Sequence, residues 1–155
     1  MGVPEVKIFF EKRGIDNEII FFDESSATVA LAAKALGTHE ERIAKTLAFN
    51  VKDKSIVVVA CGTAKIDNQK FKGAFNTKAK MMSYEETLAK TGHPVGGVCP
   101  FGLPEDVEIY IDESIKSFDT IYPAAGGTNT AVKMTPEELT HITGGIWVDV
   151  CKVAE

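Results

Sequence analysis

Alternation of apolar and polar residues predicts several strands in this chain. Residues 107–112 place Val107, Ile109 and Ile111 on one face and polar side chains on the other, as in a half-exposed strand. Residues 55–61 form the most apolar stretch, which predicts a central strand buried on both faces. Further strands are expected over residues 18–22, 45–51, 78–82, 119–124, 131–134 and 146–151.

Helices are predicted where apolar residues recur at helical spacing next to capping residues. The segment Thr135-Pro136-Glu137-Glu138 combines a capping threonine, a proline at the first helical position and a glutamate three residues after the cap. Ser83-Tyr84-Glu85-Glu86 is a second capping box, for a helix ending at Gly92, and Thr38-His39-Glu40-Glu41 is a third, before a short helical turn. Other helices are expected over residues 4–13, from Ser25 or Ser26 to 36, and over 67–74.

These elements predict an α/β (α+β) fold in a single domain, residues 1–155. Strands outnumber helices, their connections are too irregular for a doubly wound parallel sheet, and no GxGxxG or Walker sequence is present. We therefore expect a mixed, mostly antiparallel sheet that closes into a barrel-like core with peripheral helices. Two glycine-rich loops, residues 91–102 and 125–130, could then meet at one end of the barrel.

Composition indicates an ordinary globular protein of the cytoplasm. Hydrophobic residues make up 45% of the 155 residues and charged residues 25%. The sequence contains no apolar run of membrane-spanning length and no signal-peptide pattern, so no membrane partner is expected. The three cysteines, Cys61, Cys99 and Cys151, are odd in number and widely spaced, which favours reduced thiols.

A net charge of −5 means that any nucleic-acid binding must depend on a local patch. One candidate patch is rich in lysine, with Asp67 as its single acid and Phe71 and Phe75 interleaved. Its lysines either neutralise phosphates or form a solvated helix face, which is the commoner case. They are Lys65, Lys70, Lys72, Lys78 and Lys80.

The stretch 91–102 holds four glycines and two prolines between regular segments. Gly96 and Gly97 are the adjacent pair best able to form an anion-binding concavity from backbone N–H groups, for a phosphate or an oxyanion. A tight, packed loop explains the composition equally well.

Lys45 stands at the mouth of a predicted strand. If the strand already runs at Lys45, this side chain shares a face with Leu47, Phe49 and Val51. An inward-facing cation costs free energy unless it is paired or reaches a ligand, which makes Lys45 a candidate site residue. If the strand begins at Thr46, Lys45 is simply exposed.

Other catalytic chemistries find less support. The three histidines are far apart in sequence, without HExxH or CxxC, so no metal site is expected. Cys99 as nucleophile with His93 as base remains an alternative, although a buried thiol and a packed loop histidine are commoner. The lysine, the Gly96–Gly97 backbone and the polar loop at 127–130 fit an enzyme that binds an activated ester and stabilises its oxyanion.

Segments 44–47, 91–102 and 121–127, followed by the helix that begins at Thr135-Pro136, resemble the YbaK/EbsC family. This family comprises free-standing relatives of the prolyl-tRNA synthetase editing domain, and the similarity runs in the same order over nearly the whole chain. The resemblance implies a mixed barrel-like fold and hydrolysis of the ester that joins an incorrect amino acid to the terminal ribose of tRNA. It implies neither a metal nor an organic cofactor.

The resemblance also assigns expected roles to residues. Lys45 occupies the position of the family's functional lysine, which acts on substrate positioning and charge. Gly96 matches the glycine whose backbone lies against the scissile ester, and Gly97 adjoins it. Phe22 falls at a pocket-lining aromatic position but lacks the hydroxyl that some members carry. Substrate contacts are further expected from Thr46, His93, Gly127, Thr128 and Asn129, and tRNA contacts from Lys65, Lys70 and Lys72.

We expect the substrate to be a tRNA that is mischarged with cysteine, alanine or a similar small amino acid. The expected carrier is tRNA(Pro). Expected partners are the acceptor end of this tRNA and prolyl-tRNA synthetase, with the protein itself a monomer or homodimer. The alternative is a non-catalytic module that binds an acceptor end or docks on a synthetase.

Overall fold

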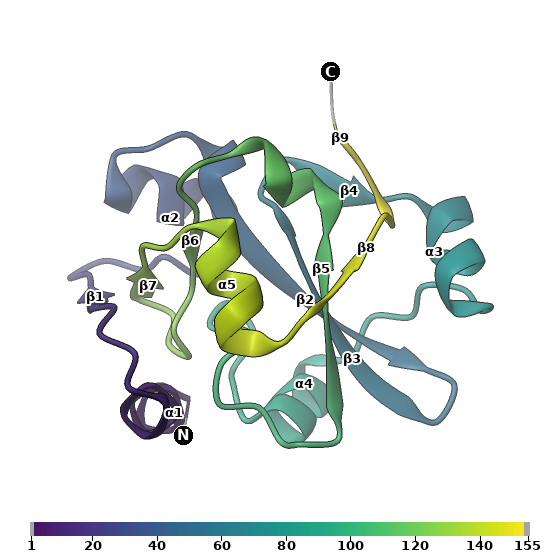
Figure 1. Ribbon diagram of the computed structural model, residues 1–155, viewed down its shortest axis with the longest axis horizontal. Coiled ribbons are helices and arrows are strands. Elements are labelled where there is room, and N and C mark those ends of the chain that lie inside the picture. Colours follow the sequence, from purple (N-terminus) through teal and green to yellow (C-terminus); the bar gives the residue numbers. More distant parts are fainter. Residues whose placement is uncertain (1, 154–155) are drawn as a thin grey trace.

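The computed structural model describes residues 2–153, which form a mixed α/β fold (Figure 1). The described helices are α1 (Val3–Arg13), α2 (Val29–Leu36), α3 (Asn68–Phe75), α4 (Tyr84–Thr91), α5 (Pro136–Thr143) and the 3₁₀ helices η1 (Glu40–Arg42) and η2 (Glu113–Ser117). The strands are β1 (Ile19–Phe21), β2 (Ile43–Val51), β3 (Lys54–Cys61), β4 (Ala64–Ile66), β5 (Val107–Asp112), β6 (Tyr122–Pro123), β7 (Thr130–Val132), β8 (Ile146–Val148) and β9 (Cys151–Val153). Within residues 2–153, each helix is too short or too polar to cross a membrane.

One curled sheet, with the strand order β6-β2-β3-β5-β8, forms a half-barrel at the centre of the molecule. Strands β2 and β3 are an antiparallel hairpin, whereas β6, β5 and β8 join the sheet in parallel. Two antiparallel ribbons, β1–β7 and β4–β9, flank it. The predicted mixed sheet with peripheral helices is confirmed, and more of the paired strand residues are antiparallel than parallel.

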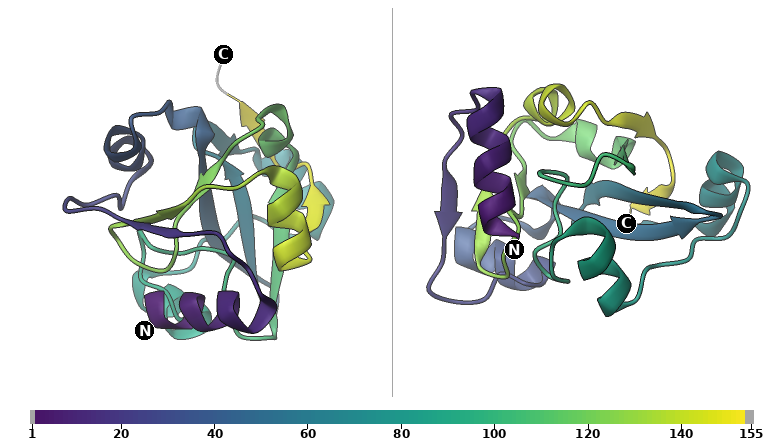
Figure 2. Two further views of the ribbon diagram at one scale, coloured as in Figure 1. Left: turned by 60° about the vertical axis from the view of Figure 1, so that its left-hand side comes forward. Right: turned by 90° about the horizontal axis from the view of Figure 1, so that it is seen from below.

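Strand β3 is the centre of the sheet, as its apolar sequence predicts. Residues 56–60 are fully buried because both faces of the sheet are covered. On one face, α1 and α5 supply Val6, Phe10 and Leu139 to a core that also contains Phe101. On the other face, α3 and the β4–β9 ribbon enclose a second core. Figure 2 shows α1 beside β1 at the periphery of the molecule.

Three predicted strands are shorter than expected because they change or lose partners. Residues 78–82 make only a single bridge, between Met81 and Phe49. Of residues 119–124, only β6 pairs with β2 as a strand. The stretch 146–151 is divided into β8 and β9 at Val150, whose N–H donates to Asp112 Oδ1 at 2.8 Å. Strand β4 precedes the predicted 67–74 helix and was not expected from the sequence; it forms because β9 returns to pair with it.

The predicted helix starts are correct where the capping residue bonds only to its own helix. The capping boxes at Ser83 and Thr135 are both present, with reciprocal bonds to the glutamate three residues later. The third predicted box is wrong, since η1 begins after His39 and no side chain caps it. Helix α2 is capped by Thr28 rather than Ser25 or Ser26, because Ser26 is bonded to a distant loop instead.

Phe71 is expected to be the residue through which α3 is anchored to the sheet. Its ring is fully buried, 5.0 Å from the Phe49 ring and 4.7 Å from the Phe75 ring. Phe71→Ala should lower the free energy of unfolding by about 3–5 kcal/mol, because it leaves a cavity between helix and sheet. Urea denaturation measures this loss, and Gln69→Ala, at an exposed position of the same helix, should change the free energy by less than about 0.5 kcal/mol.

Candidate functional site

A cavity with a volume of about 480 Å³ lies beside β2. Its walls come from β2, from residues 26–29 at the start of α2, from the first turns of α4 and from the 95–98 loop. The described lining residues include one cation, Lys45, and no acid. Residues 2–153 also contain no group of three or more His, Cys, Asp or Glu side chains placed to hold a metal. Hydroxyl-bearing lining residues are Ser26, Thr28, Thr46, Tyr84, Thr87, Tyr122 and Thr130.

One edge of β2 faces this cavity. Strand β6 pairs with β2 only at Ile43 and Ala44. Further along the same edge, the Met82 N–H donates to the Ala48 carbonyl at 3.0 Å. The β2 segment between these two contacts, residues 45–47, lines the cavity. Polar backbone along this stretch can therefore meet a ligand.

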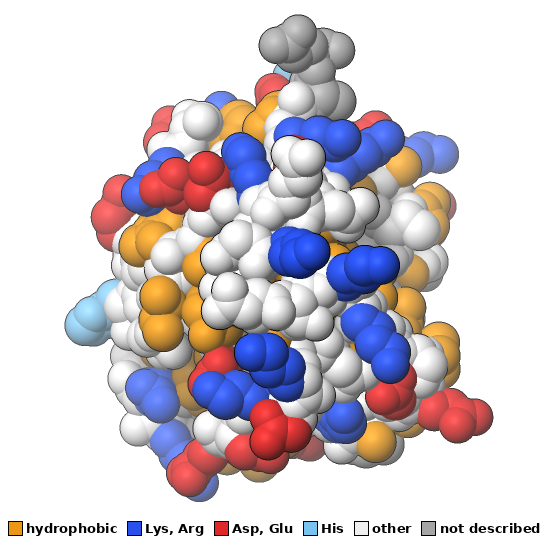
Figure 3. Space-filling view, turned by 90° about the vertical axis from the view of Figure 1, so that its right-hand side faces the viewer, with side chains coloured by type: hydrophobic (Ala, Val, Ile, Leu, Met, Phe, Trp, Pro, Cys, Tyr) orange, Lys and Arg blue, Asp and Glu red, His pale blue; other side chains and the backbone are white. Residues whose placement is uncertain are grey.

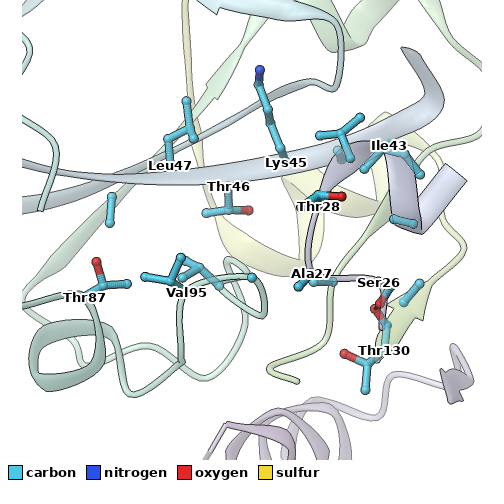
Figure 4. A pocket seen from close by; sticks show the side chains of 18 of the residues that line it. Ser26, Ala27, Thr28, Ile43, Lys45, Thr46, Leu47, Thr87, Val95 and Thr130 are labelled. Atoms are coloured by element: carbon cyan, nitrogen blue, oxygen red, sulfur yellow. Dashed lines mark hydrogen bonds between the residues drawn. The ribbon is translucent and has the colours of Figure 1, made fainter. Parts of the chain in front are cut away.

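Lys45 lies within β2, opposite Ala60 of β3, so the hypothesis that the strand begins at Thr46 is wrong. Its ammonium donates to the Gly62 carbonyl at 3.4 Å and to the Ala64 carbonyl. Partial burial lowers the pKa of the Lys45 ammonium. Figure 4 shows this side chain on the opposite side of β2 from Thr46, so the charge does not point at the part of the cavity that Thr46 lines.

Thr46 carries a buried hydroxyl for which the described residues supply no hydrogen-bond partner. Figure 4 shows the Thr46 side chain on the side of β2 where Ala27 and Val95 lie. A buried polar atom without a partner costs free energy that a bound ligand can recover. Thr46 is therefore a candidate ligand-binding residue on structural grounds.

Gly96 and Gly97 have different roles. The Gly97 N–H donates to the Pro94 carbonyl at 2.9 Å, which closes a turn with Gly96 at its third position. Gly96 has a φ of 91°, as a type II turn requires, and a Cβ there would lie 2.8 Å from Ala27 Cβ. A Cβ at Gly97 would lie 2.8 Å from the Gly127 carbonyl carbon. Gly96 thus lines the cavity, whereas Gly97 allows two loops to pack closely. The Gly97 N–H is engaged in the hydrogen bond to Pro94.

The polar loop at 126–130 holds the cavity wall from behind. The Thr128 carbonyl accepts a hydrogen bond of 2.7 Å from the Ser26 N–H. Asn129 bonds Phe22 twice, through its backbone carbonyl at 2.9 Å and its side-chain amide at 3.2 Å. Phe22, Gly127, Thr128 and Asn129 lie outside the cavity lining, while Ser26 and Thr130 are part of it.

Several lining residues were not identified from the sequence. Ser26 was interpreted only as a possible helix cap, and Thr28, Tyr84 and Thr87 only as positions in predicted helices. Thr130 was included in the glycine-rich loop at 125–130 but was not singled out. The concentration of hydroxyls between Ser25 and Thr28 was the one available signal, and it also fits capping.

His93 and Cys99 are neighbours in the core and do not line the cavity. Both are fully buried, and Cys99 Sγ lies 3.6 Å from His93 Nε2. The Phe101 carbonyl lies 2.7 Å from the same ring nitrogen. Burial raises the pKa of the Cys99 thiol to about 12 and lowers the pKa of His93. A protonated, enclosed thiol is unsuited to nucleophilic attack.

The lysines of the predicted patch are exposed on β4, on α3 and, for Lys78 and Lys80, on the segment that follows α3. Lys65 is on β4, whereas Lys70 and Lys72 are on α3. The Lys70 ammonium is bonded to Asp149 at 3.0 Å and to the Cys151 carbonyl at 3.1 Å. Figure 3 shows lysine and arginine side chains predominating across the middle of the side of the molecule that carries α3. We call the surface with Lys65, Lys70 and Lys72 the basic face.

Comparison with known proteins places this chain in a family. Residues 23–142 match the family described as the aminoacyl-tRNA editing domain. The chain is 46% identical over 154 residues to the uncharacterized protein YwhH of Bacillus subtilis, with 98% of each chain covered. It is 27% identical over 131 residues to EbsC of Enterococcus faecalis, whose name proposes a Cys-tRNA(Pro)/Cys-tRNA(Cys) deacylase, with 83% of this chain and 80% of EbsC covered.

The fold comparison agrees with the sequence comparison. A crystal structure described as that of a proposed trans-editing enzyme for prolyl-tRNA synthetase has a TM-score of 0.89 and 25% identity. It covers 97% of this chain, and 96% of its own chain is matched. The chain therefore belongs to the aminoacyl-tRNA editing domain family, the YbaK/EbsC family that is homologous to the editing domain of prolyl-tRNA synthetase.

Proposed function

We propose that this protein is a trans-editing deacylase, which hydrolyses the ester between a small amino acid and the 3′ end of a mischarged tRNA. The family implies interaction with tRNA in general. The name of EbsC supports cysteine as one amino acid and tRNA(Pro) as one carrier. Alanine and other small amino acids remain within the proposal, because an apolar pocket distinguishes one methylene by only about 1–3 kcal/mol.

The observation that carries this proposal is the Thr46 hydroxyl, which has no partner among residues 2–153 and lies in a cavity whose described lining holds no acid. An uncharged ester fits such a lining, and Thr46 can donate a hydrogen bond to a carbonyl oxygen as negative charge develops there. The turn at Gly96 brings bare backbone to the same cavity. In this proposal, the site binds the ester and stabilises its oxyanion.

The reaction then needs only water as the nucleophile. The oxygen of water adds to the ester carbonyl carbon, and the resulting oxyanion collapses as the bond to the ribose oxygen breaks. One proton of the water passes to the ribose oxygen, so the products are a free amino acid and a tRNA with intact terminal hydroxyls. No described lining residue is a carboxylate or a histidine that could act as the general base.

In this proposal, Lys45 supplies a positive charge and holds β2 in position. It is the cation among the described lining residues, and its bonds to Gly62 and Ala64 fix β2 against the chain that follows β3. A positive charge beside the open edge of β2 favours a polyanionic substrate over a neutral ester. The role agrees with that of the family's functional lysine.

The deacylase proposal predicts release of a small amino acid that depends on Lys45. Single-turnover assays with tRNA carrying alanine, cysteine, serine or proline should show rapid release of at least one of them. Lys45→Ala should slow this release about 100-fold, as does the loss of one charge-stabilising group in other enzymes. Circular dichroism of the variant controls for folding.

A different outcome would favour the rival function. Tight binding of tRNA without release of any amino acid in the panel would indicate a non-catalytic acceptor-end module. If Lys45→Ala abolished binding but left the rate of release at saturation unchanged, Lys45 would be a binding residue only.

Thr46→Val should separate activity from stability. Valine has nearly the shape of threonine and suits a strand, and the lost hydroxyl has no partner in the described protein. We expect the free energy of unfolding to stay within about 1 kcal/mol of the wild type, while deacylation slows by about tenfold for one lost hydrogen bond. Urea denaturation and single-turnover kinetics measure the two effects. An unchanged rate would remove Thr46 from the mechanism.

Cys99 should influence stability at alkaline pH but not catalysis. Its pKa is about 12 in the folded protein, against 9.0 for an ordinary thiol, so only the unfolded chain releases this proton between those values. The stability from Cys99 is therefore complete below about pH 9 and is lost as pH rises toward about 12. Between pH 10 and 11, the free energy of unfolding should fall with rising pH less steeply for Cys99→Ala than for the wild type. The difference in slope should be about 1.4 kcal/mol per pH unit. Loss of deacylation in the same folded variant would restore the cysteine mechanism.

A further inference from the structure

The cavity extends past the open edge of β2 and is lined from both faces of that strand. Successive residues of a strand point to opposite sides, so Lys45 and Leu47 lie on one face and Thr46 and Ala48 on the other. All four line the same cavity. A continuous space can reach both faces only where the strand edge is unpaired, which is the stretch between the contacts of β6 and Met82.

The two parts of the cavity differ in their surroundings. The Thr46 side adjoins Ala27, Thr87 and Val95, as Figure 4 shows. Small and apolar side chains with two hydroxyls suit the side chain of a small amino acid. We call this part the Thr46 side and the other part the Lys45 side.

The Lys45 side adjoins the basic face. Leu47 packs against the core that contains Phe49 and Phe71, so α3 covers the same face of β2 that carries Lys45. Lys45 is bonded to the Ala64 carbonyl, and the next residue, Lys65, is exposed on β4. Lys65 is close enough to lower the pKa of Lys45 by charge repulsion, after the larger effect of burial. Positive charge therefore continues from the basic face to the open edge.

Exposed apolar side chains stand at the mouth of the cavity. Met81 is 59% exposed and Tyr84 is 63% exposed, although both belong to its lining. Met81 is paired with Phe49 in register, which places it on the Lys45 side. Large apolar side chains kept in water at the entrance of a cavity are suited to stacking with a planar ligand.

We propose that a single-stranded 3′ end approaches from the basic face, with its terminal base on Met81 and Tyr84. The amino acid ester then passes the open edge of β2 into the Thr46 side. The ligand chemistry is an unpaired terminal nucleotide that carries an ester on its ribose and phosphates behind it. This inference rests on the proposed function for the ester, but the path of the RNA can be tested without hydrolysis.

Photocrosslinking tests the path directly. The probe is an uncharged acceptor-stem RNA helix that ends in single-stranded CCA with 8-azidoadenosine as its last nucleotide. The path predicts crosslinks to residues 76–84, which include Met81 and Tyr84. Crosslinks confined to residues 24–36, on the α2 side of the cavity, would overturn it.

Binding measurements with matched variants test the same path. Fluorescence anisotropy with the uncharged helix should show about tenfold weaker binding for Tyr84→Ala, since base stacking on an aromatic side chain is of that size. Lys65→Ala should make the dependence of the binding constant on salt less steep. The slope of log K against log salt should become less negative by about 0.7, the value for one phosphate contact on a single strand. The controls are Phe21→Ala, exposed but outside the cavity lining, and Lys12→Ala, on α1. Equal effects of variants and controls would overturn the path.

The two proposals fail in different ways. Crosslinks at 76–84 without release of any amino acid would leave the path standing and remove the deacylase function. Release that depends on Lys45, together with crosslinks at 24–36, would leave the function standing and remove the path. No measurable binding of the RNA helix would overturn the path, whatever the hydrolysis assays show.

Discussion

The site depends on a short length of strand edge that has no neighbouring strand. Strand β2 is paired with β3 from Ala44 to Val51 on one side, but on the other side β6 covers only Ile43 and Ala44. Exposed strand edges usually carry a risk of aggregation, and proteins cover or interrupt them. Here the edge is covered by loops that leave a cavity, so the backbone that would bind another strand is available to a ligand.

The glycine-rich loops make this cover possible. Gly96 takes a positive φ that closes a turn against Ala27, while Gly97 allows the backbone at Gly127 to come close. The 126–130 loop then holds Ser26 by a hydrogen bond and so fixes the opposite wall. Side chains at these glycines would force the loops apart and widen the cavity. Tight packing, one of the two interpretations of residues 91–102, thus builds one wall of the cavity.

Features set by local chemistry could be predicted from the sequence. The capping boxes at Ser83 and Thr135 form because all of their hydrogen bonds lie within four residues. The burial of β3 follows from its unbroken apolar run, and the face on which Lys45 lies follows from strand alternation. The family resemblance singled out Lys45 and Gly96, both of which line the cavity, and the family is confirmed.

Features set by contacts between distant segments could not be predicted. Strand β4 exists because β9 pairs with it, the open edge of β2 exists because β6 is short, and Ser26 leaves its capping role because Thr128 lies beside it. His93 and Cys99 meet in the core rather than in the cavity for the same reason. The sequence by itself determined the local elements and the family. The tertiary structure decided which hydroxyls line the cavity and which carbonyls the Lys45 ammonium meets, because those depend on segments brought together only by folding.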